Sequence, residues 1–207
     1  MVNFNDFLAK HPDFFGLEIS FEADSKFPIQ KDNELDRYFT FARFKLTVWS
    51  DENDMGEHVT LGYLNLVKIP SNFRFSPSLE KGYDMYNAME ESDLCDLPEV
   101  KNVVLNPYID RLLGITDALQ KSDLYHISEI FIYPQYRRNR LGEKLLSLMP
   151  ELIKNYFGDE DGLVSLRINP IDVPDGVTRP QAYKMLEDFY TRNGFQIFNS
   201  DIGLKRF

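Results

Sequence analysis

The chain is poor in cysteine: its 207 residues include a single one, Cys95. An internal disulfide needs two cysteines, and a metal site built on cysteine and histidine needs clustered ligands, so we expect neither. Apolar runs are short, and none approaches the roughly 18 residues that a membrane-spanning helix requires. The opening stretch, MVNFNDFLAKHPDFF, lacks the basic flank and continuous apolar segment of a signal peptide. These absences predict a cytoplasmic protein that carries no metal and does not associate with membranes.

Positive charge is also scarce. The chain has 33 Asp+Glu against 23 Lys+Arg, which gives a formal net charge of −10. Non-specific binding to nucleic acids usually depends on a basic surface, so we expect no nucleic-acid partner. There is no internal repeat, low-complexity tract or Gly/Ser linker, and the hydrophobic content of 43% is ordinary for a globular protein. We therefore interpret residues 1–207 as a single domain.

The first part of the chain has the pattern of β-strands. Aromatic and β-branched residues alternate with polar ones over 15–23, 38–49 and 58–67, which predicts three neighbouring strands in an antiparallel meander. Segment 71–123 differs, because prolines interrupt two stretches of helical character. We interpret it as a helical insertion or cap between the third and fourth core strands, with extra packing and no direct role as the alternative.

The remainder of the chain, 124–207, alternates strands with helices. Its first strand is almost continuously apolar, as expected when both faces are covered, and the helix that follows carries its apolar residues on one face. Thr178 and Gln181 form a capping-box pattern ahead of the last helix. The order predicts an α/β fold, of the α+β kind, with a mixed, mostly antiparallel sheet flanked by helices. The predicted elements are a strand at 124–133, a helix at 141–156, a strand at 162–169, a helix at 182–193 and two short closing strands.

Three arginines gather where the strand at 124–133 gives way to its helix: YPQYRRNRLGEKLL contains Arg137, Arg138 and Arg140. The start of a helix presents unpaired N–H groups, which attract anions together with the helix dipole. Gly142 has no Cβ and would let a ligand approach the backbone closely. The pattern suits a pyrophosphate. A Walker loop is excluded because no G-K-[ST] follows, and a dinucleotide fingerprint needs more glycines; solvated arginines remain the alternative.

This stretch resembles motif A of the GCN5-related N-acetyltransferases, in which an apolar residue and a proline precede [QR]-x-x-G-x-[GA] and a leucine-rich helix. Ile132, Pro134, Arg137 and Gly142 match that motif, whereas Arg140 stands where the family usually has its first glycine. Near the C-terminus, LEDFYTRNGFQIF resembles the family's L-Y-x-x-x-G-F motif. The resemblance covers 124–207 and implies a wedge between central strands that holds acetyl-CoA.

The resemblance implies a coenzyme site without a metal. The backbones of Ile130 and Ile132 would pair with the pantetheine arm like an added strand, and the backbone amides of 138–143 would hold the pyrophosphate. The implied acetyl-CoA-binding residues are Ile130, Phe131, Ile132, Arg137, Arg138, Asn139, Arg140, Leu141, Gly142 and Glu143.

Acetyl transfer also needs a base for the amine and an acid for the departing thiolate. Tyr190 matches the general acid of the family. For the base, strand parity places His126 and Ser128 on the face of the two pantetheine-binding isoleucines, and of these two only His126 titrates near neutral pH. Glu129 points to the opposite face by the same parity, so it ranks below His126. A water chain to bulk solvent is a further alternative.

We therefore expect an N-acetyltransferase that moves an acetyl group from acetyl-CoA to a primary amine of a small molecule, a protein lysine or an N-terminus. Two alternatives stay open: a catalytically inactive CoA-binding regulatory or interaction protein of the same fold, and an interaction protein that docks through 71–123. Acidic clusters at 51–54 and 90–93 could attract a polyamine, an aminoglycoside or a lysine-bearing peptide, or be solvated surface. The C-terminal strands could pair across a homodimer.

Overall fold

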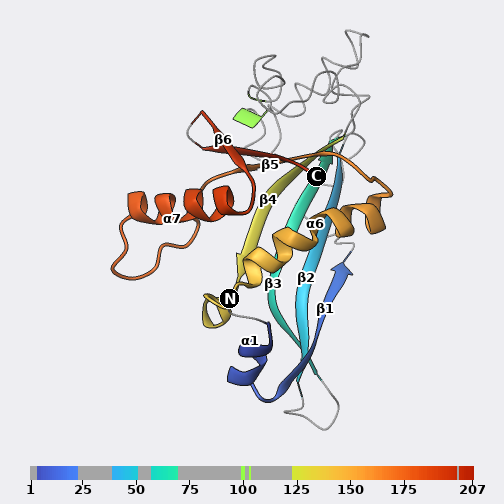
Figure 1. The fold of residues 1–207 in the computed structure, drawn as a ribbon, viewed down its shortest axis with the longest axis vertical. Coiled ribbons are helices and arrows are strands. Elements are labelled where there is room, and N and C mark those ends of the chain that lie inside the picture. The colour runs from blue at the N-terminus through green and yellow to red at the C-terminus, as the bar shows by residue number, and fades with distance from the viewer. Residues whose placement is uncertain are drawn as a thin grey trace, which may run out of the picture.

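The computed structural model describes residues 4–22, 39–50, 57–69, 99–100, 103, 123–199 and 201–207. Its strands form one seven-stranded sheet in the order β1-β2-β3-β4-β5-β7-β6, with helices beside it (Figure 1). The strands are β1 (Phe14–Glu22), β2 (Thr40–Ser50), β3 (Glu57–Ile69), β4 (Leu124–Ile132), β5 (Leu163–Arg167), β6 (Gln196–Phe198) and β7 (Ile202–Arg206). The helices are α1 (Phe4–Lys10), α6 (Leu141–Phe157) and α7 (Arg179–Arg192), with a 3-10 turn η2 (Pro134–Tyr136).

The predicted α/β class and the mixed, mostly antiparallel sheet are confirmed. Among the described strands, β4 and β5 are parallel, and every other neighbouring pair is antiparallel. The meander of β1, β2 and β3 is present as predicted. The turn between β2 and β3, both acidic clusters and Cys95 lie outside the described residues, as does the predicted insertion apart from 99–100, 103 and 123.

One helix was not predicted from the sequence. Residue Phe7 of α1 is fully buried against Leu46 of β2 and against Leu141 and Leu145 at the start of α6. This single anchor explains why a seven-residue helix forms there, since helices so short depend on tertiary packing. Helix α7 begins at Arg179 rather than at residue 182, because the predicted capping box forms and carries the helix back to that point.

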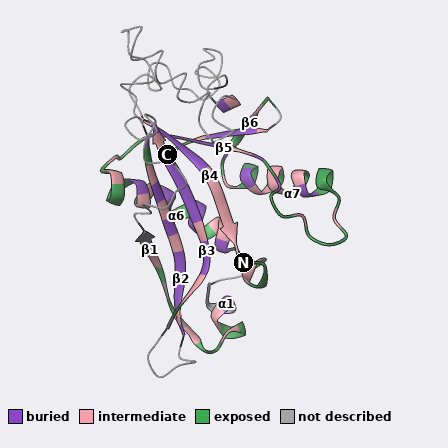
Figure 2. Cartoon of the chain, turned by 180° about the vertical axis from the view of Figure 1, so that it is seen from behind, coloured by how far each residue is buried: buried purple, intermediate pink, exposed green. Residues whose placement is uncertain are grey.

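The main core lies between the sheet and α6, where buried residues concentrate (Figure 2). Complete burial of each large apolar side chain contributes about 1.5–3 kcal/mol, which fixes α6 against the central strands. No helix in the described ranges is both long and apolar enough to cross a membrane. From α6 the core includes Leu145, Leu146, Met149 and Ile153, and from the sheet Phe44, Leu64, Leu66, Tyr125 and Ile127.

A β-bulge interrupts the pairing of β4 with β3. Leu66 of β3 faces Ile127, whereas the preceding residue, Asn65, faces Glu129. Ser128 is therefore the extra residue in β4, opposite nothing in its neighbour. One extra residue exchanges the two faces of a strand from that point onward, because side chains alternate with a period of two.

The bulge corrects the parity expected for the candidate base. Ile130 and Ile132 pack on the α6 side of the sheet, as Ile127 does ahead of the bulge. His126 directly precedes Ile127 in β4, ahead of the bulge, so its side chain lies on the opposite face of the sheet from that of Ile127. The expectation that His126 shares a face with the two isoleucines is therefore wrong. Glu129 does face away from them, as expected, and lies on the same face as His126.

Candidate functional site

Strand β5 pairs with only the first half of β4 and then ends. Their parallel pairing stops at Ile127↔Leu166, whereas β4 stays paired with β3 as far as Ile132. β5 ends at Arg167, and Pro170 soon follows; proline has no N–H with which to extend a ladder. Within the described residues, 128–132 thus lacks a strand on its β5 side. A cavity of about 670 Å³ occupies the gap, within the usual size range of small-molecule sites.

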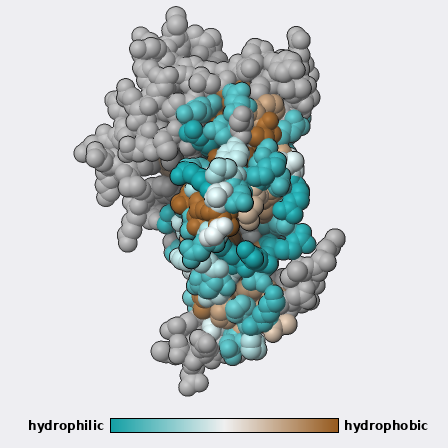
Figure 3. All heavy atoms as spheres, turned by 90° about the vertical axis from the view of Figure 1, so that its left-hand side faces the viewer, coloured by the Kyte–Doolittle hydropathy of each residue, from teal (hydrophilic) through white to brown (hydrophobic). Residues whose placement is uncertain are grey.

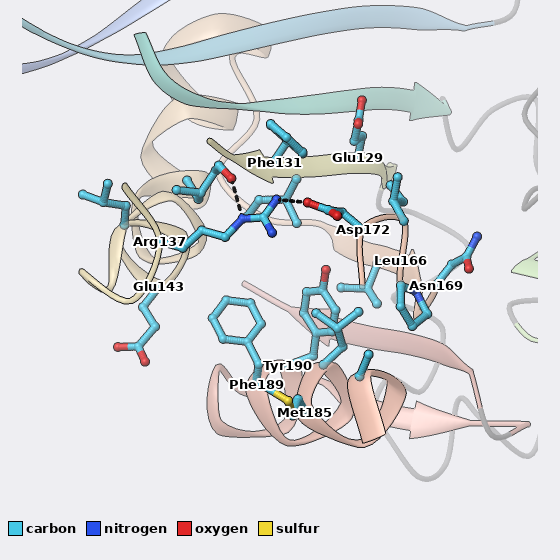
Figure 4. A pocket seen from close by; sticks show the side chains of 18 of the residues that line it. Glu129, Phe131, Arg137, Glu143, Leu166, Asn169, Asp172, Met185, Phe189 and Tyr190 are labelled. Atoms are coloured by element: carbon cyan, nitrogen blue, oxygen red, sulfur yellow. Dashed lines mark hydrogen bonds and ion pairs between the residues drawn. The ribbon is translucent and has the colours of Figure 1, made fainter. Parts of the chain in front are cut away.

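Five segments enclose this cavity: β4, the turn and first residues of α6, the end of β5, the loop from β5 to α7, and α7 itself (Figure 4). Most of the predicted site residues come together here, although they are drawn from distant parts of the chain. His126 and Asn139 do not line the cavity. The predicted residues that do are Ser128, Glu129, Ile130, Phe131, Ile132, Arg137, Arg138, Arg140, Leu141, Gly142, Glu143 and Tyr190.

The backbone of β4 presents hydrogen-bonding groups to the cavity. The amide of Tyr133 donates to the carbonyl of Leu61 in β3 at 3.0 Å. The carbonyl of Ile132 belongs to the same peptide unit and therefore points the other way, where it accepts a bond from the Arg137 side chain at 2.9 Å. Because directions alternate along an antiparallel pair, the backbone of Ile130 faces the cavity as well. This is the strand edge to which the resemblance assigns the pantetheine arm.

The turn before α6 holds two non-glycine residues in the left-handed region. Arg138 has φ 64° and Arg140 has φ 60°, a conformation that costs an L-residue about 1–2 kcal/mol. Such strain persists only where the surrounding structure imposes it, commonly at binding sites. Arg140 stands where the motif that this stretch resembles has its first glycine, the residue that adopts this conformation freely. The turn therefore has the shape that a glycine would give it.

Unpaired backbone amides gather at this turn. Within the described residues, no hydrogen bond engages the N–H groups of 138–143, whereas the next amide, of Lys144, already donates to the carbonyl of Arg140 at 3.0 Å. Helix geometry leaves the first amides of α6 without internal partners, and the dipole gives that end partial positive charge. Successive N–H groups around left-handed residues form a concave anion site. The turn is thus preorganised for an anion.

The three arginines of the turn have different partners. Arg137 pairs with Asp172 at 2.8 Å, and Arg140 pairs with Glu143 on the first turn of α6. In the described part of the chain, the exposed guanidinium of Arg138 has no hydrogen bond or ion pair, and it lines the cavity. Of the three arginines, Arg138 is therefore the one whose guanidinium could meet a ligand without first giving up a partner among the described residues.

Gly142 has a role in packing, in addition to the close approach of a ligand that the sequence predicts. A Cβ built on it would lie 3.2 Å from the ring of Phe189 in α7, closer than ordinary van der Waals contact. The start of α6 can therefore approach α7 because residue 142 has no side chain. Leu141 is buried in the core, and Asn139 turns its amide back to the carbonyls of Tyr136 and Arg137 at 3.1 and 3.3 Å.

Tyr190 points its hydroxyl from α7 into the cavity, toward β4 (Figure 4). Its ring is held edge-on against Phe189 and Phe195, and only 6% of the residue is exposed. No other described residue hydrogen-bonds the hydroxyl. Burial raises the pKa of Tyr190 well above its ordinary value, so the phenol stays protonated at neutral pH. It is therefore a proton donor with its proton in place.

His126 sits in a different environment. It is completely buried, and its Nδ1 lies 3.1 Å from the Oγ of Ser165, while Nε2 has no partner among the described residues. Burial lowers the pKa of His126 to about 4, so the imidazole is neutral at pH 7. Since it does not line the cavity, the structure does not bring His126 to the place where an amine would be deprotonated.

Glu129 does line the cavity, and both of its carboxylate oxygens accept hydrogen bonds from side chains of β3. One oxygen accepts a bond from the Tyr63 hydroxyl at 2.9 Å, and the other accepts a bond from the Asn65 amide at 3.2 Å. The Nε of Arg43 donates to the side-chain carbonyl oxygen of Asn65 at 2.9 Å, which fixes the orientation of that amide. Burial, followed by the bond to Glu129, raises the pKa of Tyr63 to about 12. These contacts leave Glu129 with one orientation.

The rim of the cavity is apolar on the α7 side. Ile171 is 67% exposed and Met185 is 54% exposed, although both are large hydrophobic residues, and both line the cavity. Figure 3 shows apolar side chains gathered among hydrophilic ones on the side of the molecule that bears α7. The rim therefore offers apolar contact to an uncharged part of a ligand.

Several residues of the site were not predicted, among them Tyr63, Asn65, Asp172 and Phe189. The alternation of β3 indicates that Tyr63 and Asn65 share a face, but nothing in the sequence pairs them with Glu129. A scan against models of known protein families finds no match, and no curated protein matches the chain in sequence. Interpretation of the site therefore depends on its residues and their geometry.

Proposed function

We propose that this protein is a GCN5-related N-acetyltransferase, which moves an acetyl group from acetyl-CoA to a primary amine. The observation that carries the proposal is that β5 pairs with only the first half of β4. It exposes a strand edge, a cluster of free amides and a buried tyrosine hydroxyl to one cavity. A mixed sheet with a gap between its central strands is also what the sequence resemblance implies.

Acetyl-CoA fits the groups that the cavity offers. The amides of 138–143 and the Arg138 guanidinium would hold the diphosphate, and they need no reorganisation to do so. The backbone of Ile130 and Ile132 would accept and donate the amide hydrogen bonds of the pantetheine arm. This arrangement would direct the thioester toward the bulge at Ser128, near the hydroxyl of Tyr190.

The chain then supplies an acid and a base. In the proposed reaction the amine nitrogen forms a bond to the thioester carbonyl carbon, and the carbon–sulfur bond breaks. Glu129 accepts the proton that the amine loses, and Tyr190 donates its hydroxyl proton to the departing sulfur. We place Glu129 ahead of His126 as the base, because Glu129 lines the cavity and His126 is sealed in the core.

Two measurements on the full chain test the proposal. Calorimetry should detect binding of coenzyme A, and release of free thiol from acetyl-CoA should accelerate when a panel of primary amines is added. Binding without thiol release from any amine would favour the catalytically inactive regulator. Absence of binding by coenzyme A would end the assignment.

Replacement of Tyr190 by Phe tests the acid directly. Tyr190→Phe keeps the buried ring and removes the proton donor, so turnover should fall about 100-fold or more while coenzyme A affinity stays within about twofold. The matched control is Tyr183→Phe, on the same helix but not on the cavity wall. Equal losses in both variants would remove Tyr190 from the mechanism.

A further inference from the structure

The side chain of Arg137 lines the cavity and contacts two of its walls. Its Nε donates to the carbonyl of Ile132 at 2.9 Å, and its Nη2 lies 2.8 Å from the carboxylate of Asp172 (Figure 4). The guanidinium also lies over the ring of Phe131, 5.4 Å from its centre. One side chain thus joins the edge of β4 to the loop between β5 and α7. We call this contact the Arg137–Asp172 strap.

The Arg137–Asp172 strap occupies a backbone carbonyl that the proposed function requires. The carbonyl of Ile132 is the last acceptor on the exposed edge of β4, and Arg137 already fills it. A ligand that pairs with this edge must bring an N–H donor of its own to replace the guanidinium. When the guanidinium is displaced, it moves off the ring of Phe131 and loses its aligned contact with the Asp172 carboxylate. It then needs a new anionic partner.

We propose that the Arg137–Asp172 strap makes the cavity selective for a ligand that carries both an amide donor and an anion. The inference rests on the proposed function, because coenzyme A has these two features in one molecule. Its pantetheine amides can replace Arg137 at the Ile132 carbonyl, and its diphosphate, next to the turn that begins at Arg137, can receive the released guanidinium. A ligand with only one of the features leaves either the carbonyl or the guanidinium without compensation.

Binding measurements with the two parts of coenzyme A distinguish the two contacts that Arg137 makes in the strap. With pantetheine and ADP as separate probes, Arg137→Ala should tighten pantetheine binding, because the carbonyl is free, and weaken ADP binding, because a positive charge is gone. We expect about three- to fivefold in each direction, the scale of a partly exposed charge pair. A purely structural role for Arg137 would move both affinities the same way.

Asp172→Asn releases the guanidinium without removing it. This variant should tighten both pantetheine and ADP by about threefold and increase hydrogen exchange in the loop 169–178, which the strap ties to β4. Asp175→Asn is the matched control, since Asp175 is exposed on the same loop, does not line the cavity and changes the net charge equally. Its affinities and loop exchange should stay as in the wild type.

The outcomes distinguish the inference from the function on which it rests. Failure of coenzyme A to bind the wild-type protein overturns both. Binding of coenzyme A, with pantetheine and ADP shifted in the same direction by Arg137→Ala, overturns the strap alone. Equal hydrogen exchange of the loop in Asp172→Asn and Asp175→Asn would also overturn the strap. This measurement is possible even if Arg137→Ala does not fold.

Discussion

The two halves of β4 make a direct comparison within one strand. Residues 124–127 pair with strands on both sides and are all buried. Residues 129–132 pair on one side only, and they and Ser128 are all half-buried. Ser128, the bulge residue, stands at the boundary. The first half fixes the sheet, and the second half presents a free edge to the cavity.

The comparison also separates two titratable side chains on the same face. His126, in the paired half, is sealed and neutral, with one ring nitrogen bonded to Ser165. Glu129, in the free half, lines the cavity and is oriented by Tyr63 and Asn65. A strand can therefore carry a structural histidine and a candidate catalytic carboxylate three positions apart, because pairing on the second side ends between them.

The largest expected effect comes from adding one methyl group beside the free half. A Cβ on Gly62 would lie 2.3 Å from the carbonyl oxygen of Phe131 and 2.7 Å from the Ile132 side chain. Gly62→Ala should lower the free energy of unfolding by about 3 kcal/mol or more, because the backbone must move. It should also weaken coenzyme A binding. Urea unfolding and calorimetry measure the two effects.

Gly158→Ala is the control for this substitution. Gly158 has φ 78°, and a Cβ added to it would meet no atom of the described residues within 4 Å, so only backbone strain of about 1 kcal/mol applies. If the two variants lost equal stability, close contact between β3 and the free half of β4 would not be what Gly62 provides.

The next prediction compares the two halves in catalysis. Glu129→Gln keeps the size of the side chain and removes the proton acceptor, so turnover should fall about 100-fold with coenzyme A affinity unchanged. His126→Gln should leave turnover within about threefold, because His126 does not reach the cavity. Steady-state rates with the best amine of the panel give both values. A larger loss in His126→Gln would reverse the roles assigned to the two halves.

A third prediction concerns acid stability. Because the pKa of His126 is lowered to about 4 in the folded protein, the unfolded chain binds more protons between pH 6.5 and 4. The free energy of unfolding therefore falls as the pH drops through this window, by about 2 kcal/mol from pH 7 to 5 on account of this residue. The slope against pH in urea unfolding should be shallower in His126→Gln. Identical slopes would show that the imidazole reaches solvent.

The features that were predicted correctly from the sequence are those that local patterns encode. The long alternation of β2 and β3, the apolar face of α6 and the capping box at Thr178 depend on residues near one another in the chain, and all three predictions hold. The turn that carries the three arginines is also encoded by residues near one another in the chain. Its neighbours in sequence already predict a strand that ends where a helix begins.

The contacts that the sequence could not give depend on register between distant segments. The bulge at Ser128 exists only because of how β4 pairs with β3, so parity counted along β4 alone put His126 on the wrong face. Tyr63 and Asn65 are 66 and 64 residues from Glu129. Asp172 meets Arg137 only after β5 has stopped and its loop has turned back. No local signal marks any of these pairings.

The smallest expected effect tests the departure at Arg140. This residue has φ 60° in the turn that presents the free amides. Arg140→Gly removes strain of about 1 kcal/mol but also increases the freedom of the unfolded chain by a similar amount, so stability should change by less than about 0.5 kcal/mol. Arg140→Val places a β-branched residue in the same conformation and should lose about 1–2 kcal/mol. Coenzyme A binding should follow the same order, near wild type in the glycine variant and weaker in the valine variant, because the proposed function has the backbone of the turn hold the diphosphate. Thermal unfolding and calorimetry decide the matter: equal tolerance of glycine and valine would mean that residue 140 leaves the left-handed region in solution, and that the amides of the turn are not held in place before the ligand arrives.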